Sequence, residues 1–357
     1  MNRIRVLVVE DSITVRERLI EVLGNDPQFE VVGKAGDGRR AIELCEALRP
    51  DVVTLDMMLP VMTGVAVTEY VMAHFPTPIL IVSASTNRGE LFRTYDALAA
   101  GAVDVLEKPT GEEAPGEWEG RFLLAVRLVS RIKVITHPRL RMGALGQQAP
   151  AEAPDETPRA ESRACEVVAI GASTGGPGAV VEILRALPSG FPIPVLLVLH
   201  IGEPFGAAFA DWLDGQSPHK VAFARDGEAL GHKGRVVMAP PDRHLAVEGN
   251  MLRLTSAPER HSCRPSVDVL FESVARRFGA GAAACLLTGM GRDGAAGLLE
   301  IRRAGGLTIA QDETTSVVYG MPREAALLGA ARSILPLGEI GAALAALAVA
   351  SPRRQSV

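Results

Sequence analysis

The chain has 357 residues, a formal net charge of −5 and 47% apolar residues, of which few are aromatic. This length exceeds what one hydrophobic core usually holds, so we expect two domains of ordinary soluble α/β type. The acidic charge argues against a reader of duplex DNA, which needs clustered lysine and arginine. The four cysteines form no CxxC pair, which favours a reducing cytoplasm over a zinc site or a disulfide framework. No apolar run reaches the roughly 18 residues of a membrane span, so we expect no membrane insertion.

Short apolar runs alternate with helix-length amphipathic segments from Arg3 to about Lys133. The runs are IRVLVVE, FEVVGKA, DVVTLDM, PILIVSA and VDVLEK. Each is short enough for a buried strand, and a helix-sized segment separates it from the next. This (βα)₅ pattern predicts a doubly wound parallel sheet with helices on both faces.

A segment rich in Pro, Ala and Glu follows, between His137 and Ala164, and its lack of an apolar period indicates a flexible linker. Strand-like runs then resume in EVVAIGA, PVLLVLH, GRVVMAP, AACLLTGM, LTIAQD and SILPL. We therefore predict a first domain at residues 1–125, a helix end and linker at 126–164, and a second domain at 165–350. The second domain is expected to be a Rossmann-like, three-layer α/β fold with a doubly wound parallel sheet.

Polar residues stand at the ends of four predicted strands of the first domain, the edge where open parallel sheets bind ligands. Glu10 and Asp11 end the first strand, Asp56 the third, Ser83 the fourth and Lys108 the fifth. Clustered carboxylates need a cation, and oxygen ligands suit Mg²⁺. An acid here could attack a phosphoryl donor while the lysine and serine bind the added phosphate. The alternative is a set of solvated strand-end side chains, but the combination favours phosphorylation.

The strings VVED, TLDMMLPVMTG, IVSAS and EKP make residues 1 to about 125 resemble the response-regulator receiver family. The resemblance implies that Asp56 is the phospho-acceptor and also binds Mg²⁺. It implies three further Mg²⁺ ligands, namely Glu10, Asp11 and the backbone carbonyl of Met58. It also implies that Ser83 and Lys108 are the residues that respond to the phosphate. The chain has Glu10 where Asp is commoner in the family, and Val105 where many members carry an aromatic residue. The second departure favours movement of the Ser83 loop as the signal.

A serine in the second domain lies in a turn-forming pattern. The predicted strand VVAI runs into Gly171-Ala172-Ser173-Thr174-Gly175, which matches G-x-S-x-G, a sharp strand-to-helix turn that exposes a nucleophilic serine. A dinucleotide-binding loop is excluded because GASTGG is not G-x-G-x-x-G. A plain glycine-rich turn stays open on this motif alone.

Candidate partners for Ser173 end neighbouring strands. His200 ends PVLLVLH, and Asp293 follows AACLLTGM in the loop GMGRDGAAG. Either alone is more often structural, the aspartate as a helix N-cap. Together with a serine at the same sheet edge they form a nucleophile, a base and an acid that orients it. The order Ser, His, Asp argues against the α/β-hydrolase fold. A second-ranked alternative pairs Ser173 with Asp242 and His261, but Asp242 lies in the turn-like APPDRH.

Longer strings then give a specific resemblance. The segments GASTGGP, APPDRHL, RPSVDVLF, LLTGMGRDGAAGL and AQDETTSVVYGMPREA resemble CheB-type protein-glutamate methylesterases over about 165–340. The resemblance implies Ser173 as nucleophile, His200 as general base and Asp293 as its orienting acid. It further implies an oxyanion hole formed by the backbone amides of Thr174 and Met290.

The implied reaction is hydrolysis of glutamate methyl esters on the cytoplasmic helices of chemoreceptors, with glutamine deamidation as a second activity. The implied phosphodonor is a CheA-type histidine kinase, the implied output sensory adaptation, and no cofactor is expected in the second domain. The segment HIGEPFG departs from the family's Pro-rich HMPPGF-like sequence. Two competing functions are a binding module with an inactive hydrolase domain, which the three triad candidates disfavour, and a DNA-binding output, for which the chain lacks a basic stripe.

The linker also suggests how the domains communicate. A receiver tied by a flexible segment to a hydrolase can dock over the crevice, and such interfaces are modest, about 600–1,500 Å². We expect the receiver face near its fourth and fifth strands to cover Ser173 in the resting state.

Overall fold

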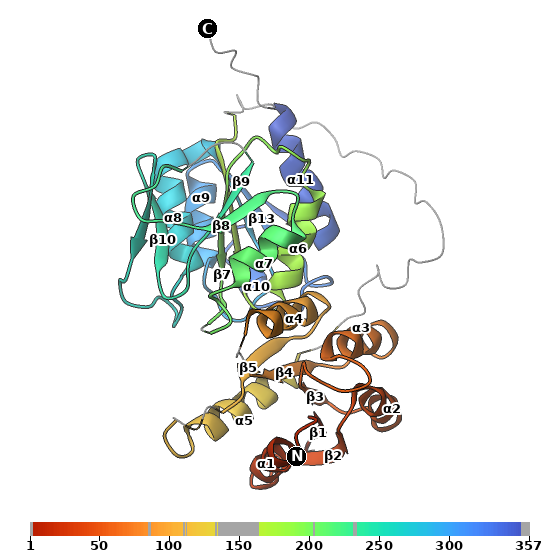
Figure 1. Cartoon of the computed structure of the whole chain (residues 1–357). Coiled ribbons are helices and arrows are strands. Elements are labelled where there is room, and N and C mark those ends of the chain that lie inside the picture. Colours follow the sequence, from red (N-terminus) through yellow and green to blue (C-terminus); the bar gives the residue numbers. More distant parts are fainter. Residues whose placement is uncertain are drawn as a thin grey trace, which may run out of the picture.

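The computed structural model describes residues 3–84, 87–109, 111, 113–132, 134, 164–202, 204–230 and 234–350. Figure 1 shows two α/β domains, the first in red to yellow and the second in green to blue. Most of the predicted linker, residues 135–163, lies outside the described part. No helix within these described ranges has both the length and the apolar character to span a membrane.

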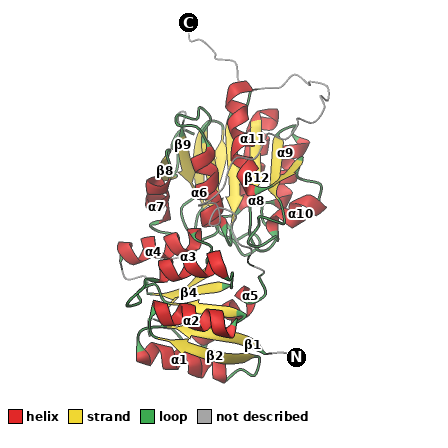
Figure 2. Cartoon of the chain, turned by 90° about the vertical axis from the view of Figure 1, so that its right-hand side faces the viewer, coloured by secondary structure: helices red, strands yellow, loops and turns green. Residues whose placement is uncertain are grey.

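Five parallel strands alternate with five helices in the first domain. In chain order the elements are β1 (Ile4–Val9), α1 (Ile13–Gly24), β2 (Phe29–Ala35), α2 (Gly38–Leu48), β3 (Val52–Leu55), α3 (Gly64–His74), β4 (Ile79–Ser83), α4 (Arg88–Ala99), β5 (Asp104–Glu107) and α5 (Glu117–Val129). The strand order is β2-β1-β3-β4-β5. Buried side chains of α1 and α5 pack on one face of the sheet, and those of α2, α3 and α4 on the other. Figure 2 shows this layering, which confirms the predicted doubly wound (βα)₅ fold.

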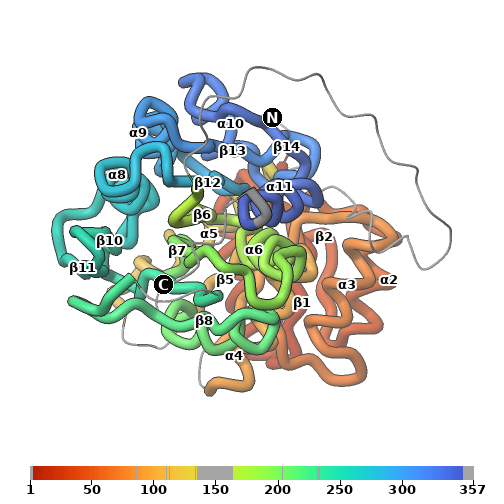
Figure 3. Tube along the Cα trace, turned by 90° about the horizontal axis from the view of Figure 1, so that it is seen from above, coloured from red at the N-terminus to blue at the C-terminus, as the bar shows by residue number. Residues whose placement is uncertain are grey.

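The second domain is built on a seven-stranded parallel sheet with the order β14-β13-β12-β6-β7-β9-β8. Its elements are β6 (Val167–Ala172), α6 (Gly176–Ala186), β7 (Val195–Leu199), α7 (Phe209–Gln216), β8 (Lys220–Phe223), β9 (Arg235–Met238), β10 (His244–Glu248), β11 (Met251–Thr255), α8 (Val267–Phe278), the 3₁₀ turn η2 (Gly279–Gly281), β12 (Ala282–Leu286), α9 (Ala295–Arg303), β13 (Leu307–Gln311), α10 (Met321–Leu327), β14 (Ser333–Leu335) and α11 (Leu337–Ala350). Figure 3 shows α6 and α11 on one side of β6, and α8 and α9 on the other. The predicted three-layer arrangement is confirmed.

One feature beyond the prediction is an antiparallel hairpin, β10–β11, outside the main sheet. Its strands meet across Gly249 and Asn250, and Gly249 has φ +60°, the left-handed conformation that glycine adopts readily. The sequence does carry a signal for it, because HLAVE and MLRLT flank a two-residue Gly-Asn turn.

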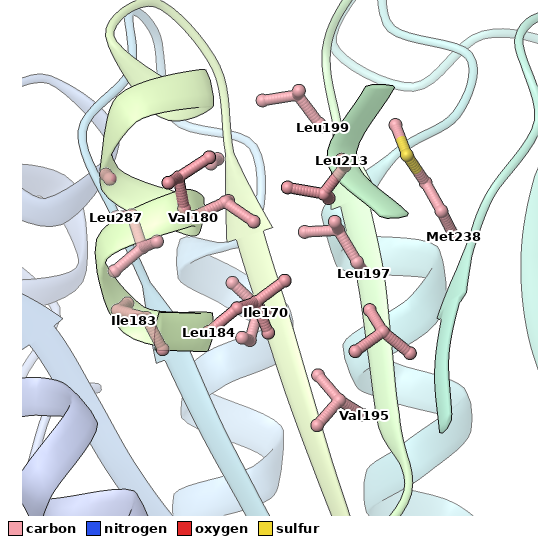
Figure 4. Close-up of a cluster of buried hydrophobic side chains, with 14 of the residues drawn as sticks. Ile170, Val180, Ile183, Leu184, Val195, Leu197, Leu199, Leu213, Met238 and Leu287 are labelled. Carbon is pink, nitrogen blue, oxygen red and sulfur yellow. The ribbon is translucent and has the colours of Figure 1, made fainter. Parts of the chain in front are cut away.

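The helix α6 is fixed on the sheet by an apolar face. Val180, Ile183 and Leu184 follow the spacing of one helical face and are fully buried against strands β6 and β7. Figure 4 shows these side chains facing Ile170 and Leu197 of the two strands. Burial of each such side chain stabilises the fold by about 1.5–3 kcal/mol. This packing fixes the position of the turn that connects β6 to α6.

The two domains meet where α4 of the first packs against α6 and α7 of the second (Figures 1 and 2). Tyr95 of α4 is fully buried in the core cluster of the second domain, and its hydroxyl donates a hydrogen bond of 2.5 Å to the carbonyl of Phe205. The indole Nε1–H of Trp212 donates to Asp96 Oδ1 at 2.8 Å. A Cβ on Gly178 would lie 3.0 Å from the carbonyl oxygen of Ala99, so a larger residue there would require α4 to move away by a few tenths of an ångström.

Candidate active site and phosphorylation site

The turn that presents Ser173 depends on glycine. The Ser173 amide donates to the Thr288 carbonyl at 3.0 Å, and its own carbonyl accepts from the Gly176 amide at 2.7 Å. Gly175 between them has φ +77°, and a Cβ there would lie 2.5 Å from Val317 Cβ. A residue with a side chain would therefore be both strained and obstructed, which explains why a small-residue pattern surrounds the serine.

His200 lies beside this turn because two parallel strands end together. Leu199 of β7 is in register with Ala172 of β6, and the His200 amide donates to the Ala172 carbonyl at 3.0 Å. The side chain is only 14% exposed, and its Nε2 lies 2.9 Å from Asp293 Oδ2. Sequence reasoning placed these three residues at one sheet edge, and the structure brings them there.

Asp293 is held by the start of a helix that precedes it in the chain. Its carboxylate accepts hydrogen bonds from the Ser266 hydroxyl at 2.8 Å, the Val267 amide at 2.7 Å and the Asp268 amide at 3.1 Å, all at the N-terminus of α8. Burial alone would raise its pKa, but the hydrogen bonds from His200, Ser266 and Val267 lower that pKa. A charged, fixed carboxylate is what an orienting acid requires.

The other ring nitrogen of His200 faces a cysteine that the sequence analysis did not predict. Cys263 Sγ lies 3.7 Å from His200 Nδ1. Burial acts to lower the pKa of His200, but Asp293 and Cys263 together raise it to about 9. Between the described residues Ser173 and His200 there is no hydrogen bond. His200 therefore pairs with Asp293 and Cys263 here, and not with the Ser173 hydroxyl.

Of the two proposed oxyanion-hole residues, Thr174 lines the same crevice. The backbone amides of Thr174 and Met290 hold no hydrogen bond to any described residue. A Cβ on Gly289 would lie 2.7 Å from Ser173 Cβ, so the loop that carries Met290 packs directly against the serine. Unused N–H donors at this position are what a tetrahedral oxyanion needs.

The second-ranked partners of Ser173 receive no support from the geometry. Asp242 accepts a hydrogen bond from Arg264 Nε at 2.7 Å and lies in a turn with φ +57°. His261 Nε2 lies 3.2 Å from Asp268 Oδ2. Each group has a different partner, so the two do not form an acid–base pair.

A cavity of about 250 Å³ lies between the domains and contains the serine and the histidine in its wall. The receiver side is formed by the end of α4, strand β5 and Arg121 of α5. Val105, the position where the sequence departs from an aromatic, lines this cavity and packs against cores of both domains. Asp104 also lines it, and its side chain is exposed. Strand β5 thus faces Ser173.

The acid cluster at the receiver sheet edge is compensated by a lysine. Asp56 and Glu10 are almost fully buried, and Lys108 Nζ lies 3.0 Å from Asp56 Oδ2 and 2.8 Å from Glu10 Oε2. Burial raises the pKa of Glu10 to about 7, against the opposing effect of Lys108. Carboxylate oxygens of Glu10, Asp11 and Asp56 lie within 4.8 Å of one another. Three convergent carboxylates, one of them exposed, fit the hard oxygen donors and open positions that Mg²⁺ prefers.

The remaining predicted receiver residues lie around this cluster. The Ser83 carbonyl accepts from the Lys108 amide at 3.0 Å, because β4 and β5 are parallel neighbours. Ser83 is buried, and among the described residues its hydroxyl donates to the Ala84 carbonyl, at 3.4 Å. Met58 follows β3 and is exposed, with its sulfur 2.7 Å from Arg93 of α4. The structure therefore places a lysine in contact with the carboxyl that we expect to be phosphorylated, and Ser83 at the end of the neighbouring strand β4.

Comparisons with known proteins agree with this architecture. Residues 168–344 match the family model described as CheB methylesterase, and residues 6–114 match the response regulator receiver domain. A protein-glutamate methylesterase/protein-glutamine glutaminase of Anaeromyxobacter dehalogenans is 45% identical over 342 residues, and one of Nitrosospira multiformis is 45% identical over 345. Both matches cover 96% of this chain and 96% of the relative.

A solved structure supports the same assignment for the second domain. The crystal structure of the Thermotoga maritima CheB methylesterase catalytic domain is 35% identical, with a TM-score of 0.50. The match covers 51% of this chain and 98% of that one. Together these matches define a hydrolase domain preceded by a receiver domain. The chain belongs to the CheB methylesterase family.

Proposed function

We propose that this chain is a phosphorylation-activated methylesterase that demethylates glutamate methyl esters, and deamidates glutamines, on chemoreceptors during sensory adaptation. The names of the two relatives, each aligned over 96% of this chain, support the activity. The observation that carries the mechanism is the His200–Asp293 pair, 2.9 Å apart, at the sheet edge beside the Ser173 turn.

The chemistry follows from these three side chains. Ser173 Oγ attacks the ester carbonyl while His200 Nδ1 takes the hydroxyl proton, and the amides of Thr174 and Met290 bind the developing oxyanion. His200 then gives the proton to the leaving methoxide, which departs as methanol. Water repeats the sequence on the acyl-enzyme, releasing glutamate and restoring Ser173. With glutamine as substrate the first leaving group is ammonia.

Asp293 contributes by orientation and charge. Its carboxylate receives three hydrogen bonds from the start of α8, so it stays ionised and cannot rotate freely. It therefore fixes the ring of His200 and stabilises the imidazolium that forms when Ser173 is deprotonated.

In the receiver we propose that Asp56 accepts a phosphoryl group from a CheA-type histidine kinase. Glu10, Asp11, Asp56 and the Met58 carbonyl would hold Mg²⁺, which when bound would offset the negative charge of the transferred group. Lys108 already contacts Asp56, and a phosphoryl group would add about −1.5 to −2 charges within its reach. Ser83 offers a hydroxyl donor to the same group.

The two domains would be coupled through β5. This strand ends at Glu107, directly before Lys108, and its Val105 and Asp104 line the cavity that contains Ser173. A phosphoryl group that displaces Lys108 or Ser83 would therefore also displace the strand that covers the crevice. We propose that the docked arrangement is a partly inhibited resting state and that phosphorylation shifts the population towards undocked molecules.

The test of this coupling compares the full-length chain with a chain lacking residues 1 to about 140, using methanol release from receptor-containing membranes. Removing the receiver should raise basal activity, by about tenfold for each 1.4 kcal/mol of docking free energy. Should the shortened chain be no faster than the unphosphorylated full-length protein, occlusion is wrong and the receiver must act by targeting or by adding substrate contacts.

The phosphorylation site has its own test. Asp56→Asn should abolish Mg²⁺-dependent labelling by a small phosphodonor, because an amide does not attack a phosphoryl group. Asp51→Asn, an acid at the opposite end of β3, serves as the control and should be labelled like the parent. Labelling that survives Asp56→Asn would move the acceptor elsewhere.

A further inference from the structure

The side chain of Cys263 completes a second hydrogen-bonded set around the catalytic base. Its Sγ is 3.7 Å from His200 Nδ1, and the opposite ring nitrogen is 2.9 Å from Asp293. A thiol, an imidazole and a carboxylate in this sequence form the arrangement by which proteins activate cysteine. Within the described part of the chain, Sγ has one further polar contact, with the His261 carbonyl at 3.4 Å.

A strained turn holds Cys263 in this place. Arg260 and Cys263 exchange backbone hydrogen bonds of 3.1 and 2.9 Å across a two-residue turn. Both central residues, His261 and Ser262, are left-handed, with φ of +52° and +59°. Such turns normally use asparagine or glycine, so this backbone is maintained against a conformational preference. The turn directs the cysteine towards the base.

Cys263 differs from the three other cysteines of the chain. Cys45 and Cys285 are buried, and burial raises the pKa of their thiols to about 11 and about 12. Cys165 is half-buried, and burial raises its pKa to about 11. Cys263 is also half-buried, but of these four it alone contacts an imidazole. A partly exposed thiol beside a cationic imidazole is the kind that oxidises selectively.

We propose that Cys263 is a peroxide-reactive modification site whose oxidation disables His200 as the base of the hydrolase. In the reaction the thiol gives its proton to His200 and the sulfur attacks one oxygen of hydrogen peroxide. The S–O bond forms as the O–O bond breaks. Hydroxide leaves and takes the proton from His200, so the products are a sulfenic acid and water. The sulfur loses two electrons and the peroxide gains them.

Oxidation would act on the nitrogen that catalysis needs. Asp293 occupies Nε2, so only Nδ1 is left to accept the Ser173 proton. A sulfenic oxygen on Cys263 lies between the sulfur and that nitrogen and offers it a competing hydrogen bond. Hydrolysis should therefore fall as Cys263 is oxidised and return when a thiol reductant removes the oxygen. This consequence rests on the proposed Ser-His-Asp mechanism, whereas the reactivity of Cys263 does not.

The experiment treats the full-length protein with hydrogen peroxide, quenches with catalase, alkylates the remaining thiols with iodoacetamide and maps them by peptide mass spectrometry. Cys263 should lose its alkylation first, and methanol release should fall by at least tenfold in parallel and recover with dithiothreitol. Cys165→Ala should behave like the parent. Any activity of Cys263→Ala, taken relative to its own untreated value, should be resistant. The proposal is overturned if Cys263 oxidises no faster than Cys165, or if hydrolysis persists with Cys263 fully oxidised.

A second measurement does not depend on hydrolysis. Ser173→Ala should oxidise at Cys263 as fast as the parent, and adding His200→Gln should slow that oxidation several-fold because the imidazole is lost. Equal rates with and without His200 would contradict the proposal even where Cys263→Ala has no activity to measure. If Ser173→Ala instead keeps its hydrolysis, the catalytic mechanism fails while the assignment of Cys263 stands.

Discussion

The receiver cluster and the catalytic crevice occupy equivalent places, the carboxyl edges of two parallel sheets, yet they differ in how complete their contacts are. In the receiver, Lys108 lies within 3.0 Å of both buried acids, so each charge has its counter-charge in place. In the crevice, His200 is well held from behind by Asp293, while Ser173 in front of it lacks its hydrogen bond to the base. On the roles proposed above, the first site already has its lysine in place, and the second lacks the hydrogen bond from Ser173 to His200.

The difference indicates where control is exerted. A phosphoryl group has only to enter the receiver cluster and compete for Lys108. On the mechanism proposed above, the crevice must both lose the β5 strand that covers it and turn His200 Nδ1 from Cys263 towards Ser173. The hydrolase therefore needs two rearrangements before it can react, whereas the receiver needs none before it is phosphorylated. This difference is what we expect of an enzyme that is regulated by its receiver.

The largest effect should come from the nucleophile. Ser173→Ala removes one oxygen from a turn of small residues, so hydrolysis should fall by about 10⁶-fold while the midpoint of thermal unfolding is unchanged. Methanol release and a thermal melt check both parts. The exposed Ser189 provides a control, since Ser189→Ala should keep the parental rate. A parental rate in Ser173→Ala would show that the crevice is not the reactive site.

Asp293→Asn should lower hydrolysis by about 10⁴-fold, because an amide stabilises the wrong tautomer of His200. It also places an amide group against the N–H groups of α8, which should cost about 1–3 kcal/mol of unfolding free energy. Asp268→Asn is the matched control. Asp268 is equally buried and accepts from the Gly297 amide at 2.6 Å, so its variant should lose stability but keep most of the activity. If both variants lose activity alike, Asp293 acts through the fold alone.

The pH dependence reports on the base. The pKa of His200 is raised to about 9, so kcat/KM of the unphosphorylated chain should rise about tenfold per pH unit up to about pH 9. Cys263→Ala should move this limb to lower pH, and Cys165→Ala should leave it unchanged. The same raised pKa contributes stability below pH 6.5, and that contribution is lost as the pH rises through 9. If kcat/KM of the parent instead stops rising near pH 6.5, the contacts of His200 with Asp293 and Cys263 do not raise its pKa as stated.

The smallest effect should come from the domain interface. Tyr95→Phe keeps the buried ring but removes the hydroxyl that donates to Phe205, a loss of about 1 kcal/mol, so basal methanol release should rise by no more than about fivefold. Tyr70 of α3 is partly exposed, and Tyr70→Phe should change nothing. Unchanged activity in Tyr95→Phe alone would mean that this hydrogen bond does not limit opening.

Sequence reasoning recovered the features that depend on local pattern. Alternating apolar runs predicted both parallel sheets, and the rule that strand ends share an edge placed His200 and Asp293 near Ser173. Contacts that depend on the conformation of loops could not be predicted from the sequence. The carboxylate of Asp293 accepts from the start of α8, more than twenty residues upstream, and Cys263 reaches the base only through the strained turn at His261 and Ser262. Neither contact has a periodic signature. The domain boundaries at 125 and 165 stay predictions.

We propose, above all, that Ser173 is the nucleophile and that the docked receiver restrains it. The most direct measurement is the rate at which a serine-directed fluorophosphonate modifies Ser173, mapped by peptide mass spectrometry, before and after phosphorylation with acetyl phosphate and Mg²⁺. We predict modification at Ser173 that becomes several-fold faster on phosphorylation, with no acceleration in Asp56→Asn. Modification at another residue, or an equal rate in both states, would contradict the account.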